Sequence, residues 1–320
     1  MKLVSTYNCI LASVYNYITQ AYPLSFQLET LLFNPDFLKL QHLYTKLLLS
    51  HPYDVSKRFV TEIGGTIEFP NVRDVAGAVA YADTHLQHTG VLPIAINLKY
   101  SVLDPAPFDN DFWNFQMVVE RSDEQHFIMF DMFHGTKYTV NMHHFSNMID
   151  TPFNYRNEGE FTPFMIIHIP DVEHTRHLLL QTNITDRLLG ALQAYSPAHN
   201  LAEGCAFIEY IRNAFLKEEV TDLHDEVYRI MGFQIIISKS REQLLNSAAA
   251  IGIPITEEDR ELVKWWETFR LQLAMTINRR EAEGYEHLLW MYRDLNRHET
   301  LVVERLEQQI VLMQTKGAAQ

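Results

Sequence analysis

The chain has 320 residues, of which 47% are apolar and 21% are charged; these proportions are typical of soluble globular proteins and argue against disordered and fibrous classes. Its net charge of −14, from 26 basic and 40 acidic residues, repels polyphosphate and so disfavours nucleic-acid and anionic-membrane roles. Two cysteines are too few for the disulfide framework of a small secreted protein, and no apolar run reaches the roughly 18 residues that a membrane-spanning helix needs. No secretory signal is recognised in the first residues, so we expect a cytoplasmic protein.

The first half of the chain mixes helical and strand-like patterns. Apolar residues recur at helical spacing over 9–18 and 72–86, and the apolar stretch 26–49, broken at Asn34-Pro35, is predicted to form two more helices. Short segments rich in branched and aromatic residues predict strands, with a short helix over 143–148 before the last strand. The predicted strands are 92–98, 115–120, 126–131, 138–140 and 164–169. Polar connections between the middle three favour an antiparallel meander.

After Pro170 nearly the whole chain shows helical periodicity. The predicted helices are 175–194, 202–216, 222–237, 240–251, 257–280 and 285–314. Thr256 and Asp259 form a pattern like a capping box at the start of the fifth helix, and Gly284 is expected to end it. We therefore predict an α+β domain over residues 1–172 and an all-α domain over 173–320. The apolar stripe of the last helix can pack within the chain or form a dimer seam.

Cys9 is the leading candidate for a reactive side chain. It stands at the start of the first predicted helix, where the helix N-terminus can stabilise a thiolate and so make a thiol nucleophilic near neutral pH. The alternative is that Cys9 is a small apolar core residue, which is a common role for a lone cysteine in a buried helix. The residues around it help to choose between these two roles.

Residues 7–15 (YNCILASVY), followed later by a strand at 115–120, a turn, and a strand ending at Asp131, resemble the papain-like Cys–His–Asp layout. More narrowly, the chain resembles the amino-terminal domain of butirosin biosynthesis protein H and its relatives in antibiotic gene clusters. The segments 90–98 (GVLPIAINL), 131–133 (DMF) and 138–140 (YTV) are similar to successive elements of that family. The resemblance covers residues 5 to about 150 and implies a papain-like domain followed by a helical one, with Cys9 as nucleophile.

The histidine of that family is missing from this sequence. On the strand before Asp131 the chain reads WNFQMVV over 113–119, and Gln116 can orient a neighbour or form hydrogen bonds but cannot take a proton at neutral pH. Three explanations are open. The strand is misaligned, or another histidine such as His126 or His134 takes the role, or catalysis has been abandoned. The candidate catalytic residues are therefore Cys9, Gln116 and Asp131.

Two functions follow from this resemblance. In the first, Cys9 accepts an acyl or aminoacyl group from a thioester on the phosphopantetheine of an acyl or peptidyl carrier protein and passes it to an amine, while Asp131 orients a proton-handling partner. Thioester exchange needs no general acid, because the departing thiolate is a good leaving group. In the second, the protein is catalytically degenerate and acts as a binding partner in an assembly line. A third function, a thiol peptidase, needs the absent histidine most.

The remaining patterns narrow the expected ligands. Residues 1–60 carry five basic and three acidic residues, which suggests a mildly basic face near Cys9 for an acidic carrier protein, and the acidic remainder suits a polycationic amine. The fifteen histidines show no metalloenzyme spacing, and no phosphate-binding loop is found. We therefore expect no metal, no cofactor and no nucleic-acid partner, and a homodimer is an open alternative.

Overall fold

The chain forms two compact units that do not follow the simple order of the sequence. The computed structural model describes residues 3–49, 52–101, 103, 113–156, 160–217 and 223–317. Unit 1 comprises residues 1–31 and 52–182, and unit 2 comprises 32–51 and 183–320. The boundary lies at Thr182 rather than at the predicted residue 172, and the segment 32–51 leaves the first unit to join the second.

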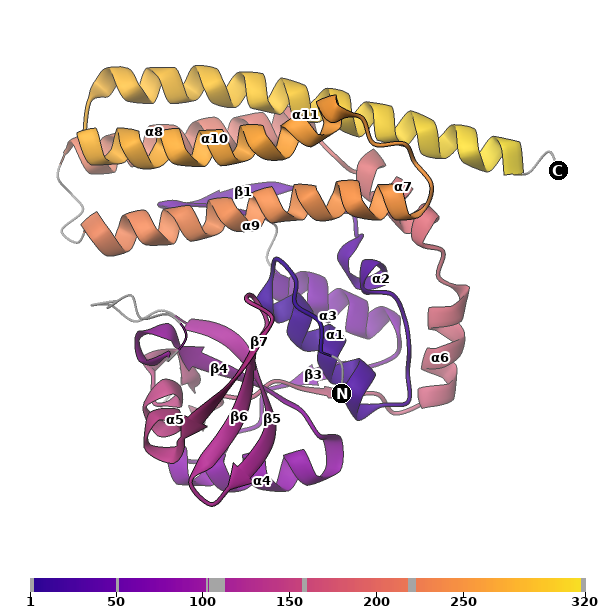
Figure 1. The fold of residues 1–320 in the computed structure, drawn as a ribbon, viewed down its shortest axis with the longest axis vertical. Helices are drawn as coiled ribbons and strands as arrows, with labels where there is room; N and C mark the ends of the chain where they lie inside the picture. The colour runs from indigo at the N-terminus through magenta and orange to yellow at the C-terminus, as the bar shows by residue number, and fades with distance from the viewer. Residues whose placement is uncertain are drawn as a thin grey trace. The chain divides into compact units, whose positions relative to one another are not determined.

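Unit 1 is built around a four-stranded antiparallel sheet. Its strands are β4 (Leu92–Asn97), β5 (Trp113–Asp123), β6 (His126–Asp131) and β7 (Thr136–Asn141), and they lie side by side in that order (Figure 1). The predicted antiparallel meander is confirmed by the register of β5, β6 and β7. The predicted first helix is confirmed as α1 (Cys9–Ala21), which packs on β4 and β5. This packing brings the N-terminus of α1 to the sheet.

Shorter elements complete unit 1. They are all but the last residue of α2 (Leu28–Leu32), α3 (Pro52–Glu62), β3 (Thr66–Glu68), α4 (Val75–Thr89), α5 (Met142–Ile149), β8 (Tyr155–Arg156), β9 (Glu160–Phe161), β10 (Ile166–His168), α6 (Val172–Gln181) and 3-10 turns at Leu98–Tyr100 and Pro152–Asn154. β3 pairs with β10 and β8 pairs with β9, each in an antiparallel pair. The first half of the chain is therefore mixed α and β, with small antiparallel sheets.

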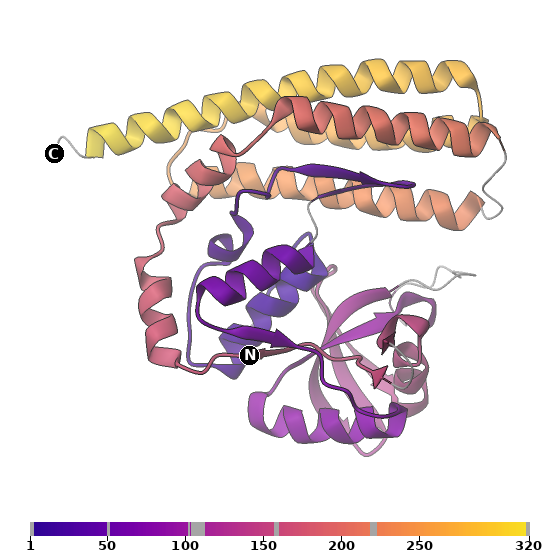
Figure 2. The same ribbon diagram turned by 180° about the vertical axis from the view of Figure 1, so that it is seen from behind.

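The stretch 26–49 departs most from the sequence-based prediction of two helices. It forms only the short α2 and then a hairpin of β1 (Leu40–Leu43) and β2 (Lys46–Leu49), which runs along the long helices of unit 2 (Figure 2). The side chain of Asn200 supports this extended backbone, because its Oδ1 accepts the N–H of Leu40 at 2.9 Å and its Nδ2 donates to the carbonyl of Leu38 at 2.9 Å. Tertiary hydrogen bonds therefore override a local helical pattern.

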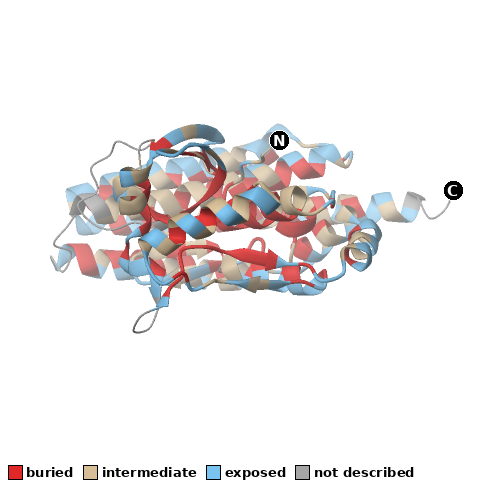
Figure 3. Cartoon of the chain, turned by 90° about the horizontal axis from the view of Figure 1, so that it is seen from below, coloured by how far each residue is buried: buried red, intermediate tan, exposed pale blue. Residues whose placement is uncertain are grey.

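Unit 2 is otherwise helical, as predicted. Its helices are α7 (Ile184–Gln193), α8 (Pro197–Leu216), α9 (Leu223–Ala250), α10 (Glu257–Arg279) and α11 (Ala282–Gly317). Buried and exposed residues alternate along them (Figure 3). The predicted helix 175–194 is divided between α6 and α7, and the two predicted helices 222–237 and 240–251 are one helix, α9.

The two ends of α10 test two of the predicted signals. The capping box is confirmed at its start, where the Thr256 hydroxyl accepts the N–H of Asp259 and the Asp259 carboxylate accepts the N–H of Thr256. The prediction that Gly284 ends α10 is wrong, because Arg280 in the left-handed conformation (φ 55°) does so and Gly284 lies inside α11.

Candidate functional site at Cys9

Cys9 is the first residue of α1 and lies beside the end of β6. Two contacts hold this end of the helix, since the Thr6 N–H donates to the carbonyl of Met132 at 3.2 Å and the Ser13 hydroxyl lies 3.4 Å from the Met132 sulfur. Asn8 caps the helix, and its Oδ1 accepts the N–H groups of Ile10 at 3.0 Å and Leu11 at 3.3 Å. The predicted position of Cys9 at a helix N-terminus is therefore confirmed.

Asp131 ends β6 and is buried. Its Oδ1 accepts the backbone N–H groups of Phe133 at 2.8 Å and His134 at 2.7 Å, and the ring Nδ1 of His134 lies 3.3 Å from the same oxygen. Its Oδ2 accepts a hydrogen bond from Nε2 of Gln116 at 3.0 Å. Both carboxylate oxygens are thus engaged by neighbouring groups.

Gln116 is the side chain that donates a hydrogen bond to Oδ2 of Asp131 from the neighbouring strand. It is fully buried in β5, and its Oε1 accepts a hydrogen bond from the Tyr138 hydroxyl of β7. Tyr138 belongs to this network, although the sequence analysis named it only as part of a family segment. Strand alternation could have found it, because residues 138 and 136 share a face of β7 and Thr136 is paired with Asp131.

Three contacts bear on the histidine that the resemblance leads us to expect. Gln116 of β5 and Asp131 of β6 are joined by a hydrogen bond across the two strands. His126 lies 2.9 Å from Asp123 at the hairpin end, and His134 is paired with Asp131. Within the described residues, no histidine forms a hydrogen bond with the Cys9 thiol. The site therefore contains the Cys9 thiol and the Asp131 carboxylate, which is bound by the Gln116 amide on one oxygen and lies beside the exposed His134 ring on the other.

The Cys9 thiol is neutral at pH 7. The residue keeps some exposed surface, but protein surrounds the sulfur, and this burial raises the pKa of the Cys9 thiol to about 11. A backbone hydrogen bond from Phe115 lowers this pKa, while the negative charge of Asp131 raises it further. The backbone N–H groups of Cys9 and Ile10 at the helix N-terminus also lower this pKa, but their effect is smaller than that of burial.

Alkylation of Cys9 should therefore be slow and should increase with pH well beyond neutrality. With a pKa of about 11, the fraction of Cys9 present as thiolate at pH 7.5 is about 100-fold below that of an ordinary thiol of pKa 9.0. The more basic thiolate is also the stronger nucleophile, which restores about tenfold of the alkylation rate. We expect a Cys205→Ala variant to react with iodoacetamide about tenfold more slowly than a small thiol. The rate should increase about tenfold per pH unit through pH 10.

The control is the Cys9→Ala/Cys205→Ala variant, which should take up no label. A rate that levels off below pH 9 would contradict the assignment of a neutral thiol and would show an activated thiolate at Cys9.

The charge around Cys9 differs from the expected basic face. Lys39 and Lys46, two of the five basic residues in 1–60, belong to unit 2. Unit 1 has nine basic and 18 acidic residues, hence a net charge of −9, which leaves −5 of the chain's −14 for unit 2. The unit that carries Cys9 is thus the more acidic one, and its long-range field favours cations.

The structure was also searched for metal sites and membrane-spanning helices, and the sequence was compared with known proteins. In the part of the chain that the structure describes, no group of three or more His, Cys, Asp or Glu side chains is placed to hold a metal ion. None of the described helices has the length and apolar character needed to cross a membrane. Comparison with models of protein families and with curated proteins finds no match for this sequence.

Proposed function

We propose that the protein is a catalytically degenerate relative of the papain-like acyltransferases that it resembles and acts as a binding partner in a natural-product assembly line. The observation that carries this proposal is the hydrogen bond between Gln116 and Asp131, in which an amide occupies the place of a basic imidazole. The amide cannot accept a proton from the thiol at neutral pH. Oδ2 of Asp131 then orients an amide that has no role in proton transfer, and the His134 ring beside Oδ1 is exposed.

Two magnitudes support the loss of catalysis. A general base contributes about 10²–10⁴-fold to rate in enzymes of this kind. In addition, a thiol with a pKa of about 11 is ionised in about one molecule in 10⁴ at pH 7. The two effects overlap, because a general base acts by removing the thiol proton. Among the described residues, no other group at Cys9 makes up for the missing base or for the raised thiol pKa.

The acidic charge of unit 1 favours a cationic amine as the ligand over an acidic carrier protein. A net charge of −9 attracts polycations at a distance and repels a partner of the same sign. The acyl or peptidyl carrier protein suggested by the resemblance would need a locally basic contact on this unit.

A second candidate, the cysteine-dependent acyltransferase, is favoured by one contact. The backbone hydrogen bond from Phe115 to the Cys9 sulfur is the kind of contact that stabilises a thiolate, and it is present at a partly exposed cysteine at a helix N-terminus. Exchange with a thioester would proceed through the minor thiolate form without a general acid.

Intact-mass measurement separates the two functions. The Cys205→Ala variant and the Cys9→Ala/Cys205→Ala variant are incubated at pH 7.5 with an acyl-pantetheine thioester and with an acylated carrier protein. We expect no acyl adduct on either variant, or an equal small adduct on both from lysine acylation. An adduct on the first variant that is absent from the second would overturn the degenerate assignment in favour of the acyltransferase.

A further inference from the structure

The apolar residues of α11 divide into a covered stripe and an exposed one. Those of the covered stripe, including Leu288, Tyr292, Leu295, Leu306 and Ile310, are at most 1% exposed because they pack within the chain. This packing accounts for most of the stripe recognised in the sequence. The side chains of Trp290, Leu301 and Leu312 are each 57% exposed, and Val311 is 41% exposed.

The exposed stripe continues along one side of the helix. Its members are spaced so that they return to the same side of an α-helix, and from residue 290 to residue 312 they span about 33 Å at 1.5 Å per residue. We define the outer face of α11 as Trp290, Arg297, Leu301, Glu304, Val311 and Leu312. A partner that covers this face has to match both its separated apolar side chains and the charges of Arg297 and Glu304.

Contacts within unit 2 hold the other sides of α11. Arg305 is paired with Asp259 of α10, and Gln314 donates to Asp186 of α7 at 2.7 Å. In the described part of the chain, neither Arg297 nor Glu304 makes an ion pair. The outer face therefore has two exposed charges of opposite sign that are not used inside the chain.

The outer face is complementary to itself in one antiparallel register. If two copies of α11 run in opposite directions with Leu301 facing Leu301, residue 290 faces residue 312 and residue 297 lies one position from facing residue 304. Trp290 then meets Leu312 of the other copy twice, once at each end, and Arg297 meets Glu304 twice. An isologous contact of this kind closes on itself, as twofold dimers do.

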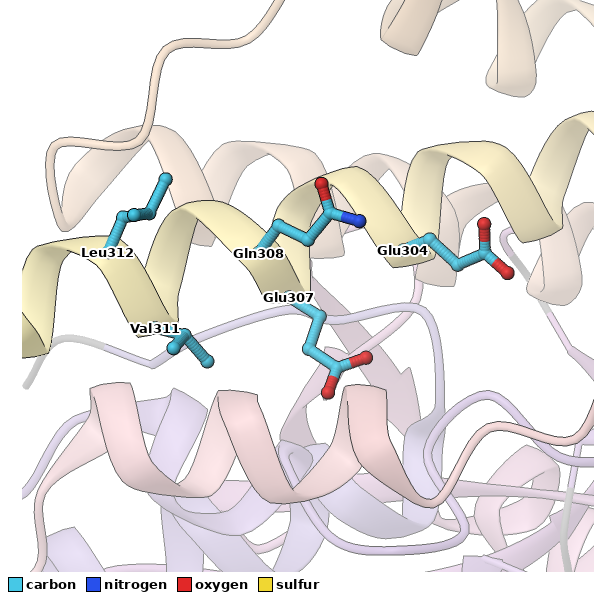
Figure 4. A pocket seen from close by; sticks show the side chains of 5 residues that line it. All are labelled: Glu304, Glu307, Gln308, Val311 and Leu312. Carbon is cyan, nitrogen blue, oxygen red and sulfur yellow. The ribbon is translucent and has the colours of Figure 1, made fainter.

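An open hollow on the surface of α11 lies next to the position that Trp290 of the second copy reaches in this register. Glu304, Glu307, Gln308, Val311 and Leu312 line it, and Figure 4 shows their side chains distributed along this part of the helix. The apolar part of this lining, Val311 and Leu312, is the part that faces residue 290 of the second copy. An indole ring placed there would bury apolar surface of both partners.

We propose that two copies of this chain associate through the outer face of α11, antiparallel, with Leu301 on the twofold axis, Trp290 in the hollow of the other copy, and Arg297 paired with Glu304. The proposal is independent of the function proposed for unit 1. It assigns the second copy as the occupant because both the apolar residues and the charges of the face complement themselves in a single register.

Sedimentation velocity of the full chain over a range of concentrations tests this dimer. We expect a species of twice 37.4 kDa for the wild type and a shift to 37.4 kDa for Leu301→Glu, because two carboxylates would then meet on the axis. The matched control is Leu271→Glu, since Leu271 of α10 is similarly exposed at 55% but lies outside the outer face. The control should remain dimeric.

The charges test the register. Arg297→Glu should weaken the dimer at least tenfold, and the double variant Arg297→Glu/Glu304→Arg should restore it. A monomeric wild type, a dimer that persists in Leu301→Glu, an equal effect of Leu271→Glu, or no rescue by the charge exchange would overturn the proposal. Thermal melting of each variant checks that unit 2 remains folded.

Discussion

Replacement of Glu299 by glutamine is expected to lower the free energy of unfolding by about 3–5 kcal/mol, the cost of leaving a buried charge without its partner. Arg241 is fully buried, and its Nη2 and Nε donate to Glu299 at 2.7 and 3.3 Å. The same carboxylate accepts Trp266 Nε1 at 2.8 Å. Glutamine retains the shape and one acceptor but removes the charge that balances the guanidinium.

Chemical denaturation followed by circular dichroism measures this loss. Glu261→Gln is the control, because Glu261 pairs with the exposed Lys264 and its replacement should leave the denaturation midpoint nearly unchanged. The double variant Arg241→Met/Glu299→Leu should recover part of the stability, since apolar residues can replace a buried pair but leave Trp266 Nε1 without its acceptor. A Glu299→Gln variant as stable as the control would contradict the assignment of a charged pair.

The same substitution should loosen the hairpin of unit 2. Arg241 Nη2 also donates to the carbonyl of Leu38 at 3.2 Å, two residues before the start of β1. Hydrogen exchange of residues 40–49 should therefore accelerate in Glu299→Gln more than exchange in the sheet of unit 1.

Replacement of Gly204 by alanine is expected to lower the free energy of unfolding by about 3 kcal/mol, at the upper end of the range for overpacked cores. A Cβ at this position of α8 would lie 1.9 Å from Cζ of Tyr292. The ring cannot easily move, because it is buried and its hydroxyl donates to the carbonyl of Asn200 at 2.8 Å. The clash exceeds the gain of about 1 kcal/mol from the better helix propensity of alanine.

Gly232→Ala gives the matched comparison for this prediction. Gly232 lies inside α9, and a Cβ there would meet no atom within 4 Å. The variant should therefore gain about 0.5–1 kcal/mol, so the two glycine substitutions should change the urea midpoint in opposite directions. Equal effects would show that the close approach of Tyr292 does not control the packing of α8.

Much of unit 1 was predictable because its signals are local. The helix at Cys9 follows from apolar spacing and the Asn8 cap, and the meander of β5, β6 and β7 follows from alternation and polar turns. Unit 2 was predictable to the same degree, since long helices carry strong periodicity. The capping box at Thr256 is correct for the same reason, as its two partners are three residues apart.

The errors lie where distant residues decide the structure. The β1–β2 hairpin has a local pattern that resembles a helix, and it is extended because Asn200 and Arg241, far along the chain, bind its backbone near Leu38 and Leu40. The membership of 32–51 in unit 2 follows from the same contacts. It also assigns Lys39 and Lys46 to unit 2, so two of the five basic residues expected to share a face with Cys9 do not belong to its unit.

The sequence by itself determined which chemical groups are available at the candidate site: a thiol at a helix start, a carboxylate at a strand end, and a glutamine on the strand before that carboxylate. Only the tertiary structure decided what these groups do to one another. Burial of the Cys9 sulfur beside Asp131 raises its pKa to about 11, although the sequence position at a helix N-terminus predicts a lowered pKa. Desolvation depends on every atom packed around the sulfur, and a linear pattern of residues does not contain that information.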